Sequence, residues 1–313
     1  MTETGREQRL VQRIEQLYAT DPQFRAAAPL AEVTDAAHQP QLRLWEVVET
    51  YLNGYLDRPA LGQRACEPRR DDTTGRTTTA LLPGFDTITY RQLRDRVEAL
   101  SAAWQSTLPD GFNPGDFIAV LGFTSIDYAT IYLTCLRLGA VFVPLQTSST
   151  ATQLAPIVAE TAPRICTASV ESLDTAVEVL IDAPSVERLV VFDYTSDDEQ
   201  HERYRAAAER LAGAGRDIDV VPLADDLGAG LELPRTPANV AAPEENPLTT
   251  LIYTSGSTGA PKGAMYTADM MTRLWQRPHS PSLDIGIQIP AIHLQYMPLS
   301  HVYGLEWLIA TLA

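Results

Sequence analysis

The fold of this chain is decided by one stretch, L-I-Y-T-S-G-S-T-G-A-P-K-G, which runs from Leu251 to Gly263. Its first three residues are apolar, as at the end of a buried strand, and the composition then changes abruptly to glycine and hydroxyl side chains. Glycines let a backbone approach a ligand closely, and the N–H groups of such a turn form an anion-binding concavity. Lys262 adds one positive charge at the far edge of the loop. The stretch therefore predicts a strand followed by a polyphosphate-binding loop.

Two widespread phosphate motifs do not fit this loop. In a Walker loop the lysine follows a glycine and precedes Ser or Thr, whereas Lys262 follows Pro261. The Rossmann spacing G-x-G-x-x-G is absent as well. A flexible surface loop is the alternative, since loops are generally rich in these residue types, but the order of strand, hydroxyls, glycines and Pro-Lys-Gly favours nucleotide binding. The predicted nucleotide-binding residues of the loop are Thr254, Ser255, Gly256, Ser257, Thr258, Gly259 and Lys262.

The overall composition is that of a globular protein, with 45% hydrophobic and 20% charged residues in 313 positions. The sequence contains neither a run of about 18 apolar residues nor a secretory signal, so we expect a cytoplasmic protein. A net charge of −16 opposes electrostatic binding to nucleic acid or to anionic membranes. The three cysteines are widely spaced and suggest neither a disulfide framework nor a zinc site. A nucleotide must therefore be held by local groups, such as those around Lys262.

Strands and helices alternate along most of the chain, which indicates βαβ units and a largely parallel sheet. Besides the strand that ends at Tyr253, we expect strands at 117–121, 140–145, 164–167 and 189–192. Helices are predicted at 6–20, 42–56, 89–107, 126–138, 150–161, 170–181 and 199–211. Between these elements we expect an irregular wrap at 26–40, an exposed hairpin or loop at 62–79 and a surface excursion at 212–247.

The phosphate-loop stretch resembles, almost letter for letter, that of the adenylate-forming superfamily of acyl-CoA synthetases, luciferases and peptide-synthetase adenylation domains. Residues 138–145, L-G-A-V-F-V-P-L, are similar to an early structural motif of the superfamily. Residues 297–304, M-P-L-S-H-V-Y-G, are similar to its P-hydrophobic-x-H-x-x-G segment. The N-terminal arm at 9–29 resembles carboxylic acid reductases in particular, because other acyl-activating enzymes usually lack it. One departure is Leu305-Glu306 after Gly304, where the pattern has a basic residue.

His301 is the second candidate catalytic residue, beside Lys262. It follows a predicted strand, Leu294–Met297, and precedes a helix that Tyr303-Gly304 begins, which predicts a position at the carboxyl edge of a sheet, where α/β sites form. The alternative is a packed or capping histidine. The resemblance implies that His301 lies beside the acyl carboxylate and the α-phosphate. The other histidines, His38, His201, His279 and His293, show no ligand spacing, so no metal ligands are assigned.

The resemblance implies an α/β fold, the N-terminal subdomain of an adenylate-forming enzyme with largely parallel sheets layered with helices. It divides the chain into a helical arm, residues 1–40, and the front part of an adenylation domain, residues 41–313. It also implies ATP and Mg²⁺ as cofactors and a small carboxylic acid as substrate. In carboxylic acid reductases the activated acyl group passes to the phosphopantetheine of a carrier domain and is reduced to an aldehyde with NADPH.

The expected downstream parts are not found in these 313 residues. The sequence lacks a carrier serine motif, a second dinucleotide fingerprint and the superfamily's later magnesium, ribose and lysine segments, and it ends in an apolar helical segment, 307–313. We therefore expect a C-terminally truncated front part of a longer chain, inactive by itself. An acyl-CoA synthetase, a peptide-synthetase adenylation domain and a non-catalytic nucleotide-binding fragment remain alternatives.

Overall fold

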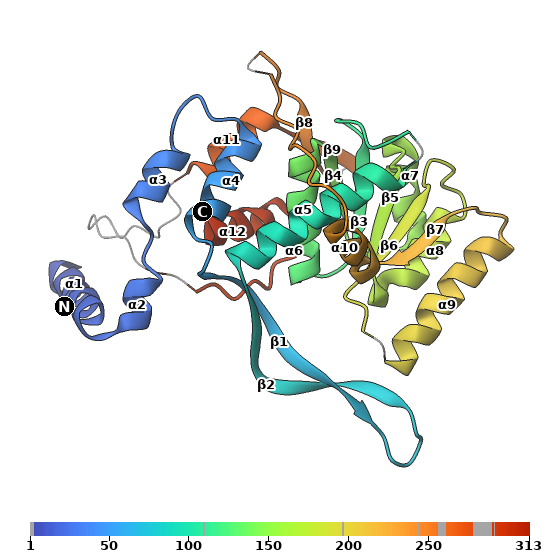
Figure 1. The fold of residues 1–313 in the computed structure, drawn as a ribbon, viewed down its shortest axis with the longest axis horizontal. Coiled ribbons are helices and arrows are strands. Elements are labelled where there is room, and N and C mark those ends of the chain that lie inside the picture. The colour runs from blue at the N-terminus through green and yellow to red at the C-terminus, as the bar shows by residue number, and fades with distance from the viewer. Residues whose placement is uncertain are drawn as a thin grey trace.

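The computed structural model describes residues 3–108, 110–195, 197–242, 244–255, 261–277, 290 and 292–313. Within these ranges the centre of the molecule is a seven-stranded sheet of order β7-β6-β5-β3-β4-β8-β9. Helices cover both of its faces (Figure 1). Neighbouring strands run parallel, except for the antiparallel pair β8 and β9. The predicted α/β class with a largely parallel sheet is therefore confirmed.

The middle of the sheet consists of β3 (Phe117–Leu121), β4 (Val141–Leu145), β5 (Ile165–Ser169) and β6 (Arg188–Phe192). Almost every residue of these strands is buried, because helices pack on both sides of the sheet. Burial on both faces explains why each strand is a continuous apolar run rather than an alternating one. All of them lie within two residues of the predicted ranges.

Helices connect these strands in the predicted order, and their ends follow from capping residues. Ser125 accepts a hydrogen bond from the backbone N–H of Tyr128 at the start of α6, and Gly139 ends that helix with a φ of 69°, a conformation that glycine adopts without strain. The helices are α5 (Tyr90–Thr107), α6 (Ile126–Leu138), α7 (Ala151–Thr161), α8 (Leu173–Leu180) and α9 (Asp198–Gly213).

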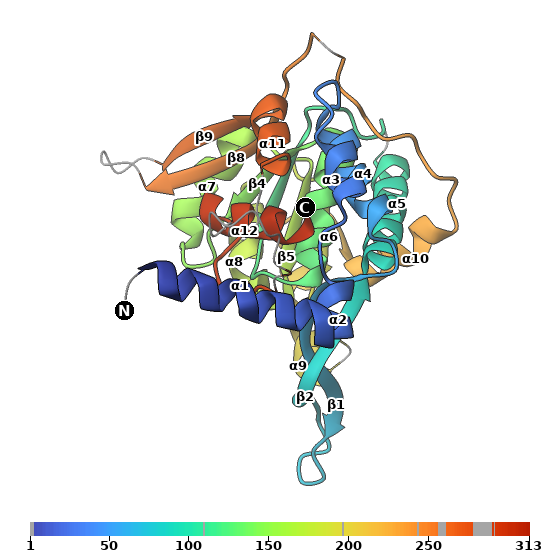
Figure 2. The same ribbon diagram turned by 90° about the vertical axis from the view of Figure 1, so that its left-hand side faces the viewer.

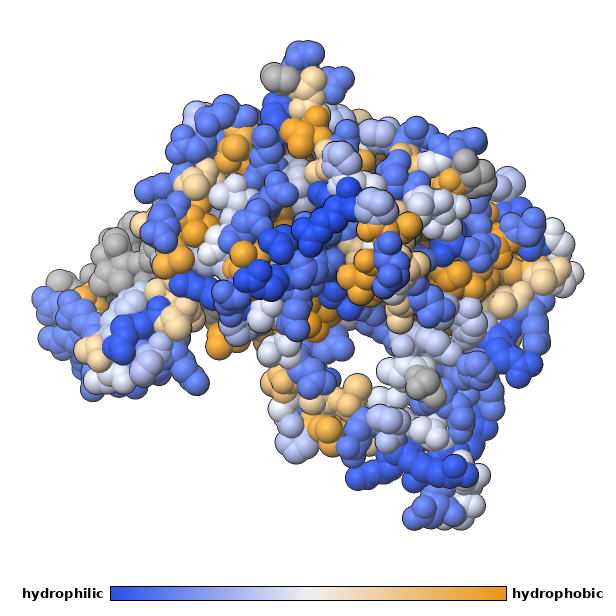
Figure 3. Space-filling model, in the orientation of Figure 1, coloured by the Kyte–Doolittle hydropathy of each residue, from blue (hydrophilic) through white to orange (hydrophobic). Residues whose placement is uncertain are grey.

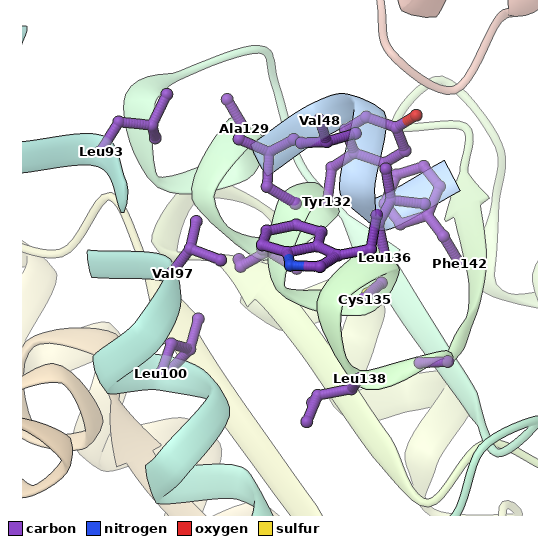
Figure 4. Close-up of a cluster of buried hydrophobic side chains, with 14 of the residues drawn as sticks. Val48, Leu93, Val97, Leu100, Ala129, Tyr132, Cys135, Leu136, Leu138 and Phe142 are labelled. Atoms are coloured by element: carbon purple, nitrogen blue, oxygen red, sulfur yellow. The ribbon is translucent and has the colours of Figure 1, made fainter. Parts of the chain in front are cut away.

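Two hydrophobic clusters occupy the two faces of the sheet. One cluster includes side chains from α7, α8 and α9. The other includes α5 and α6 together with α4 (Leu44–Gly54), α11 (Ala268–Trp275) and α12 (Val302–Leu312). Figure 4 shows part of this second cluster, where Tyr132 of α6 packs edge to face on Phe142 of β4 with ring centroids 5.1 Å apart. The free thiols of Cys135 and Cys166 are buried in these clusters.

The predicted surface excursion at 212–247 is partly wrong, because it contains β7 (Asp219–Pro222) and α10 (Leu223–Leu231). β7 extends the sheet beside β6. The indole N–H of Trp104 donates to the buried carboxylate of Asp226 over 2.9 Å, and Asp226 also pairs with the buried Arg188. This polar network fixes α10 against α5 and β6. A four-residue strand in a Gly/Pro/Asp-rich segment gives too short a pattern to detect.

The N-terminal segment is more helical than predicted. α1 (Glu3–Thr20) and α4 confirm the expected helices, and α2 (Pro22–Ala26) starts directly after α1 because the Asp21 side chain accepts from the N–H groups of Gln23 and Phe24. The predicted irregular wrap at 26–40 contains α3 (Ala31–Ala37). Figures 1 and 2 show α1 and α2 at the end of the molecule opposite to α9.

A long hairpin projects from the body (Figure 1), and side chains near its tip bond to the start of α9. It consists of β1 (Pro59–Arg70) and β2 (Thr77–Thr89), and so confirms and lengthens the exposed hairpin expected at 62–79. Near the tip, the Thr79 hydroxyl donates to Asp197 over 2.6 Å and Arg76 pairs with Glu202 at 2.8 Å. The space-filling view shows an opening between the hairpin and the body (Figure 3). The hairpin is therefore attached to the body both at its base and near its tip.

The C-terminal part contains β8 (Leu248–Ser255), β9 (Pro261–Thr267), α11 and α12. β9 was not predicted. The strand predicted at Leu294–Met297 is wrong: among the described residues, this segment pairs with no strand, and Leu294 and Tyr296 are 78% and 79% exposed. Its alternating pattern has the period of a strand, but no strand among the described residues lies beside it.

Candidate active site

The predicted phosphate loop joins β8 to β9, which gives its two ends a fixed spacing. β8 runs parallel to β4 and ends at Ser255, while β9 starts at Pro261 and pairs with it antiparallel. Thr254 lies directly opposite Lys262 in this register. Gly256, Ser257, Thr258 and Gly259 lie outside the described residues, as does the side chain of Ser255. The structure thus brings together Thr254 and Lys262 at the carboxyl end of β8, where the loop begins and ends.

Lys262 is the single lysine of the chain, and the other residues in the count of 24 lysines and arginines are arginines. It is exposed, and within the described residues its ammonium group forms no ion pair. A compact ammonium group on a flexible stem suits a phosphate as a point charge. Because the whole molecule carries −16, binding of a polyphosphate depends on local cations such as this one.

Gly263 makes room for the side chains of β8. A Cβ at this position would lie 2.7 Å from the Leu251 side chain and 3.4 Å from the ring of Tyr253. The missing side chain lets β9 lie flat against β8, which positions the neighbouring Lys262. This glycine therefore has a packing role in the strand pair, and a close backbone approach to a ligand stays a prediction for the loop glycines.

His301 is the N-cap of α12, as expected from a helix that begins at Tyr303-Gly304. Its Nδ1 accepts a hydrogen bond from the backbone N–H of Tyr303 over 3.1 Å. Because this bond occupies the Nδ1 lone pair, the neutral ring carries its proton on Nε2. His301 is exposed, so the Nε2–H is a donor available to an oxygen of a ligand. The capping alternative and the functional role are thus compatible, since they use different nitrogens.

The segment that carries His301 is attached to the carboxyl end of β3. The Thr124 hydroxyl, three residues beyond β3, donates to the carbonyl of Met297 over 3.2 Å. One strand further along the sheet, the Gln146 amide after β4 donates to the carbonyl of Tyr253 in β8 over 3.4 Å. Neighbouring strands lie about 4.8 Å apart, so the ends of β3 and β8 are separated by about 10 Å. The phosphate-loop ends and the segment that carries His301 therefore lie at the same edge of the sheet. Among the described residues, no hydrogen bond or ion pair joins His301 to Lys262.

Asp193 is a titratable residue at the same edge that the sequence did not reveal. It directly follows β6 and adopts a left-handed φ of 51°. Burial, and then the neighbouring carboxylate of Asp127, raises the pKa of Asp193 to about 7, although a hydrogen bond with Ser125 and the charge of Arg96 oppose the shift. The only sequence signal was an acidic residue after an apolar run, which is too common to single out.

The histidines outside the site have structural contacts. His38 bonds to the carbonyl of Thr34, His201 bonds to the hydroxyl of Tyr194, and His293 packs on Trp307 with ring centroids 4.7 Å apart. His279 lies outside the described residues. In the part of the chain that the structure describes, no three His, Cys, Asp or Glu side chains are grouped as a metal site would require. No helix in that part is long and apolar enough to cross a membrane.

Comparison with known families identifies the class of protein. Residues 68–313 match the family described as AMP-binding enzyme, and the chain belongs to this family. The particular resemblance is to carboxylic acid reductases. The chain is 44% identical to the carboxylic acid reductase of Mycobacterium marinum over 317 aligned residues and 46% identical to that of Mycobacterium tuberculosis over 309. These alignments cover 100% and 98% of this chain and 26% of each relative.

Solved structures agree with this assignment. The A domain of carboxylic acid reductase from Segniliparus rugosus, in complex with AMP and a co-purified carboxylic acid, matches with a TM-score of 0.92 and 42% identity. The adenylation domain of the reductase from Mycobacterium chelonae matches with a TM-score of 0.89 and 43% identity. The matches cover 97% and 98% of this chain, and 48% and 46% of those chains. The predicted resemblance to the front part of such a domain is confirmed, and the chain spans about half the length of these solved domains.

Proposed function

We propose that this chain is part of an adenylation domain that activates a small carboxylic acid with ATP, as the first step of its NADPH-dependent reduction to an aldehyde. The observation that carries the proposal is the similarity of nearly the whole chain, at a TM-score of 0.92, to a domain described in complex with AMP and a carboxylic acid. The position of Thr254, Lys262 and His301 at one edge of the sheet supports it. Ligand sites of open α/β sheets lie at this edge.

The reaction is a displacement at phosphorus. A carboxylate oxygen attacks the α-phosphorus of ATP, the bond from that phosphorus to the bridging oxygen of the β-phosphate breaks, and pyrophosphate leaves with the electron pair. The products are an acyl-adenylate and pyrophosphate. Such reactions depend on positioning and on neutralising the charge of the phosphate oxygens more than on covalent help from the protein.

The residues have separate roles in this scheme. Lys262 holds the β- and γ-phosphates through its ammonium group, assisted by the Thr254 hydroxyl and the loop from Ser255 to Gly259. His301 donates its Nε2–H to the substrate carboxylate or to an α-phosphate oxygen. The capping bond at Nδ1 keeps the imidazole in the tautomer that this donation requires.

We keep Mg²⁺ as a companion of ATP, which is usually held by phosphate oxygens and one or two carboxylates rather than by a full set of protein ligands; the described residues contain no group of three His, Cys, Asp or Glu side chains, so no ligand to the ion is assigned among them. No step is therefore assigned to it, and the charge of ATP is left to Lys262 and the N–H and O–H donors of the loop. NADPH and phosphopantetheine belong, in the proposed enzyme, to reductase and carrier domains, and no described residue is assigned to either. We further propose a cytoplasmic enzyme that binds neither nucleic acid nor membranes, in line with its charge of −16.

The experiment that tests the proposal is product analysis with the complete adenylating protein that contains this chain. Incubation with ATP, a carboxylic acid, coenzyme A and NADPH is expected to yield AMP, pyrophosphate and an aldehyde. A stable thioester without aldehyde assigns the chain to the acyl-CoA synthetase or peptide-synthetase alternative instead. The absence of acid-dependent exchange between pyrophosphate and ATP contradicts adenylation itself.

A further inference from the structure

The turn that presents His301 is held by more than its own sequence neighbours. Within the turn, the backbone N–H of His301 donates to the carbonyl of Pro298 over 3.1 Å. The first turn of α12 lies against the same carbonyl, because a Cβ at Gly304 would come within 2.1 Å of it. The direction of the His301 ring therefore depends on how α12 is placed relative to residues 297–298.

One side chain spans that junction. The amide nitrogen of Gln295 donates to the carbonyl of Met297 over 2.9 Å and to the carbonyl of Gly304 over 3.0 Å. A carboxamide has two N–H hydrogens, so a single group can satisfy both carbonyls. Gln295 thereby connects the start of the turn to the first turn of α12, with His301 in between.

A second bond ties this assembly to the sheet. The carbonyl of Met297 also accepts the hydrogen bond from the Thr124 hydroxyl, over 3.2 Å. A carbonyl oxygen has two lone pairs and accommodates both donors. Thr124 follows β3, so this bond fixes the position of the turn relative to the carboxyl edge of the sheet. The Met297 carbonyl is thus the point at which Gln295 and Thr124 act together.

We propose that Gln295 is a positioning residue for adenylation, which acts through His301 by fixing α12 to the Met297 carbonyl, with Thr124 in a supporting role. The inference rests on the function proposed for His301. Neither residue belongs to the motif M-P-L-S-H-V-Y-G that carries the resemblance. Their importance follows from hydrogen bonds to a shared carbonyl rather than from contact with substrate.

The test is a double-mutant cycle on acid-dependent exchange of pyrophosphate with ATP, measured with the complete adenylating protein. Gln295→Met keeps the length of the side chain and removes both donors. We expect kcat to fall about tenfold with KM for ATP changed less than twofold, since Lys262 and the loop are untouched. In a His301→Ala background the same substitution is expected to cause no further loss, because groups that act through one another are not additive. Thr124→Val is expected to behave in the same way with a smaller loss.

The matched control is Gln39→Met, which removes another amide-to-carbonyl bond of 2.9 Å, from Gln39 to Asp35, on the exposed surface near α3. It is expected to leave exchange unchanged. Equal losses for Gln295→Met in both backgrounds, or an unchanged kcat in the wild-type background, overturn the positioning role. Should Gln295→Met fail to fold, Thr124→Val in the two backgrounds decides the question. If His301→Ala alone leaves exchange intact, the role proposed for His301 fails, and with it this inference; exchange absent from the wild type refutes adenylation instead.

Discussion

Lys262 provides a direct test at the scale of a single residue. Substitution by alanine removes one charge-assisted contact to phosphate, worth about 1.5–3 kcal/mol, which corresponds to an increase of about 10- to 100-fold in KM for ATP. Lys262→Arg keeps the charge in a planar group and is expected to retain part of the affinity. The measurement is pyrophosphate exchange as a function of ATP concentration. Unchanged ATP kinetics in the alanine variant would show that Lys262 does not hold the nucleotide.

Asp193 gives a prediction on pH dependence. Its ordinary pKa of 3.8 is raised to about 7 in the folded protein, so the folded state binds the proton more tightly than the unfolded state. The stability from this group is complete below pH 3.8 and is lost as the pH rises toward 7, at no more than about 1.4 kcal/mol per pH unit. Asp193→Asn, which tolerates the left-handed conformation, should lessen the decline of the unfolding free energy between pH 5 and 7.

Urea unfolding at pH 5, 6 and 7 measures this difference. The exposed Asp182 is a suitable control, and Asp182→Asn is expected to keep the pH dependence of the parent protein. The same slope in Asp193→Asn and in the parent would mean that Asp193 is already ionised at pH 5.

At the scale of elements, the β1–β2 hairpin depends on the N-cap of α9. Burial acts to raise the pKa of Asp197, but hydrogen bonds from Thr79, Gln200 and Thr195 outweigh it and keep the pKa low. Thr79→Val removes one of the bonds that attach the hairpin to the body and leaves the backbone cap at Gln200 in place, whereas Asp197→Ala removes both this bond and the cap. We expect faster tryptic cleavage at Arg70 and Arg76 in both variants, and a stability loss of about 1 kcal/mol in Asp197→Ala from the lost cap.

Limited proteolysis with mass analysis separates these effects. Thr78→Val is the matched control, because among the described residues the Thr78 hydroxyl bonds within the hairpin, to the carbonyl of Arg69. Cleavage at the parent rate in Thr79→Val would show that the tip is held by other contacts, such as the pair of Arg76 and Glu202.

The sequence predicted those elements whose own residues carry the whole signal, either an apolar run or a helix with capping residues at its ends. β3 to β6 are unbroken apolar runs, and α5 to α7 are helices whose ends are marked by capping residues. The missed elements depend on partners elsewhere: β9 is largely exposed and exists because β8 lies beside it, and β7 depends on β6. In the candidate site, Lys262 and His301 are proposed from motif letters. Thr124 and Gln295 are not, because only the folded chain brings them to one carbonyl.

At the scale of the whole molecule, the chain spans about half of the solved adenylation domains it resembles. We expect the 313 residues alone to show no acid-dependent pyrophosphate exchange, because residues from the rest of the adenylation domain are needed to enclose ATP and the acid. The complete adenylating protein, assayed in parallel, is the reference. Exchange by the 313-residue chain at a comparable rate would show that these residues contain the whole machinery.

The solitary, exposed ammonium group on β9 has a practical consequence. An acylating reagent applied at neutral pH has one side-chain amine to attack in these 313 residues, and that amine stands where a nucleotide's phosphates are expected. Peptide mass spectrometry with and without ATP would then report occupancy as a footprint at a single position, with no engineered label.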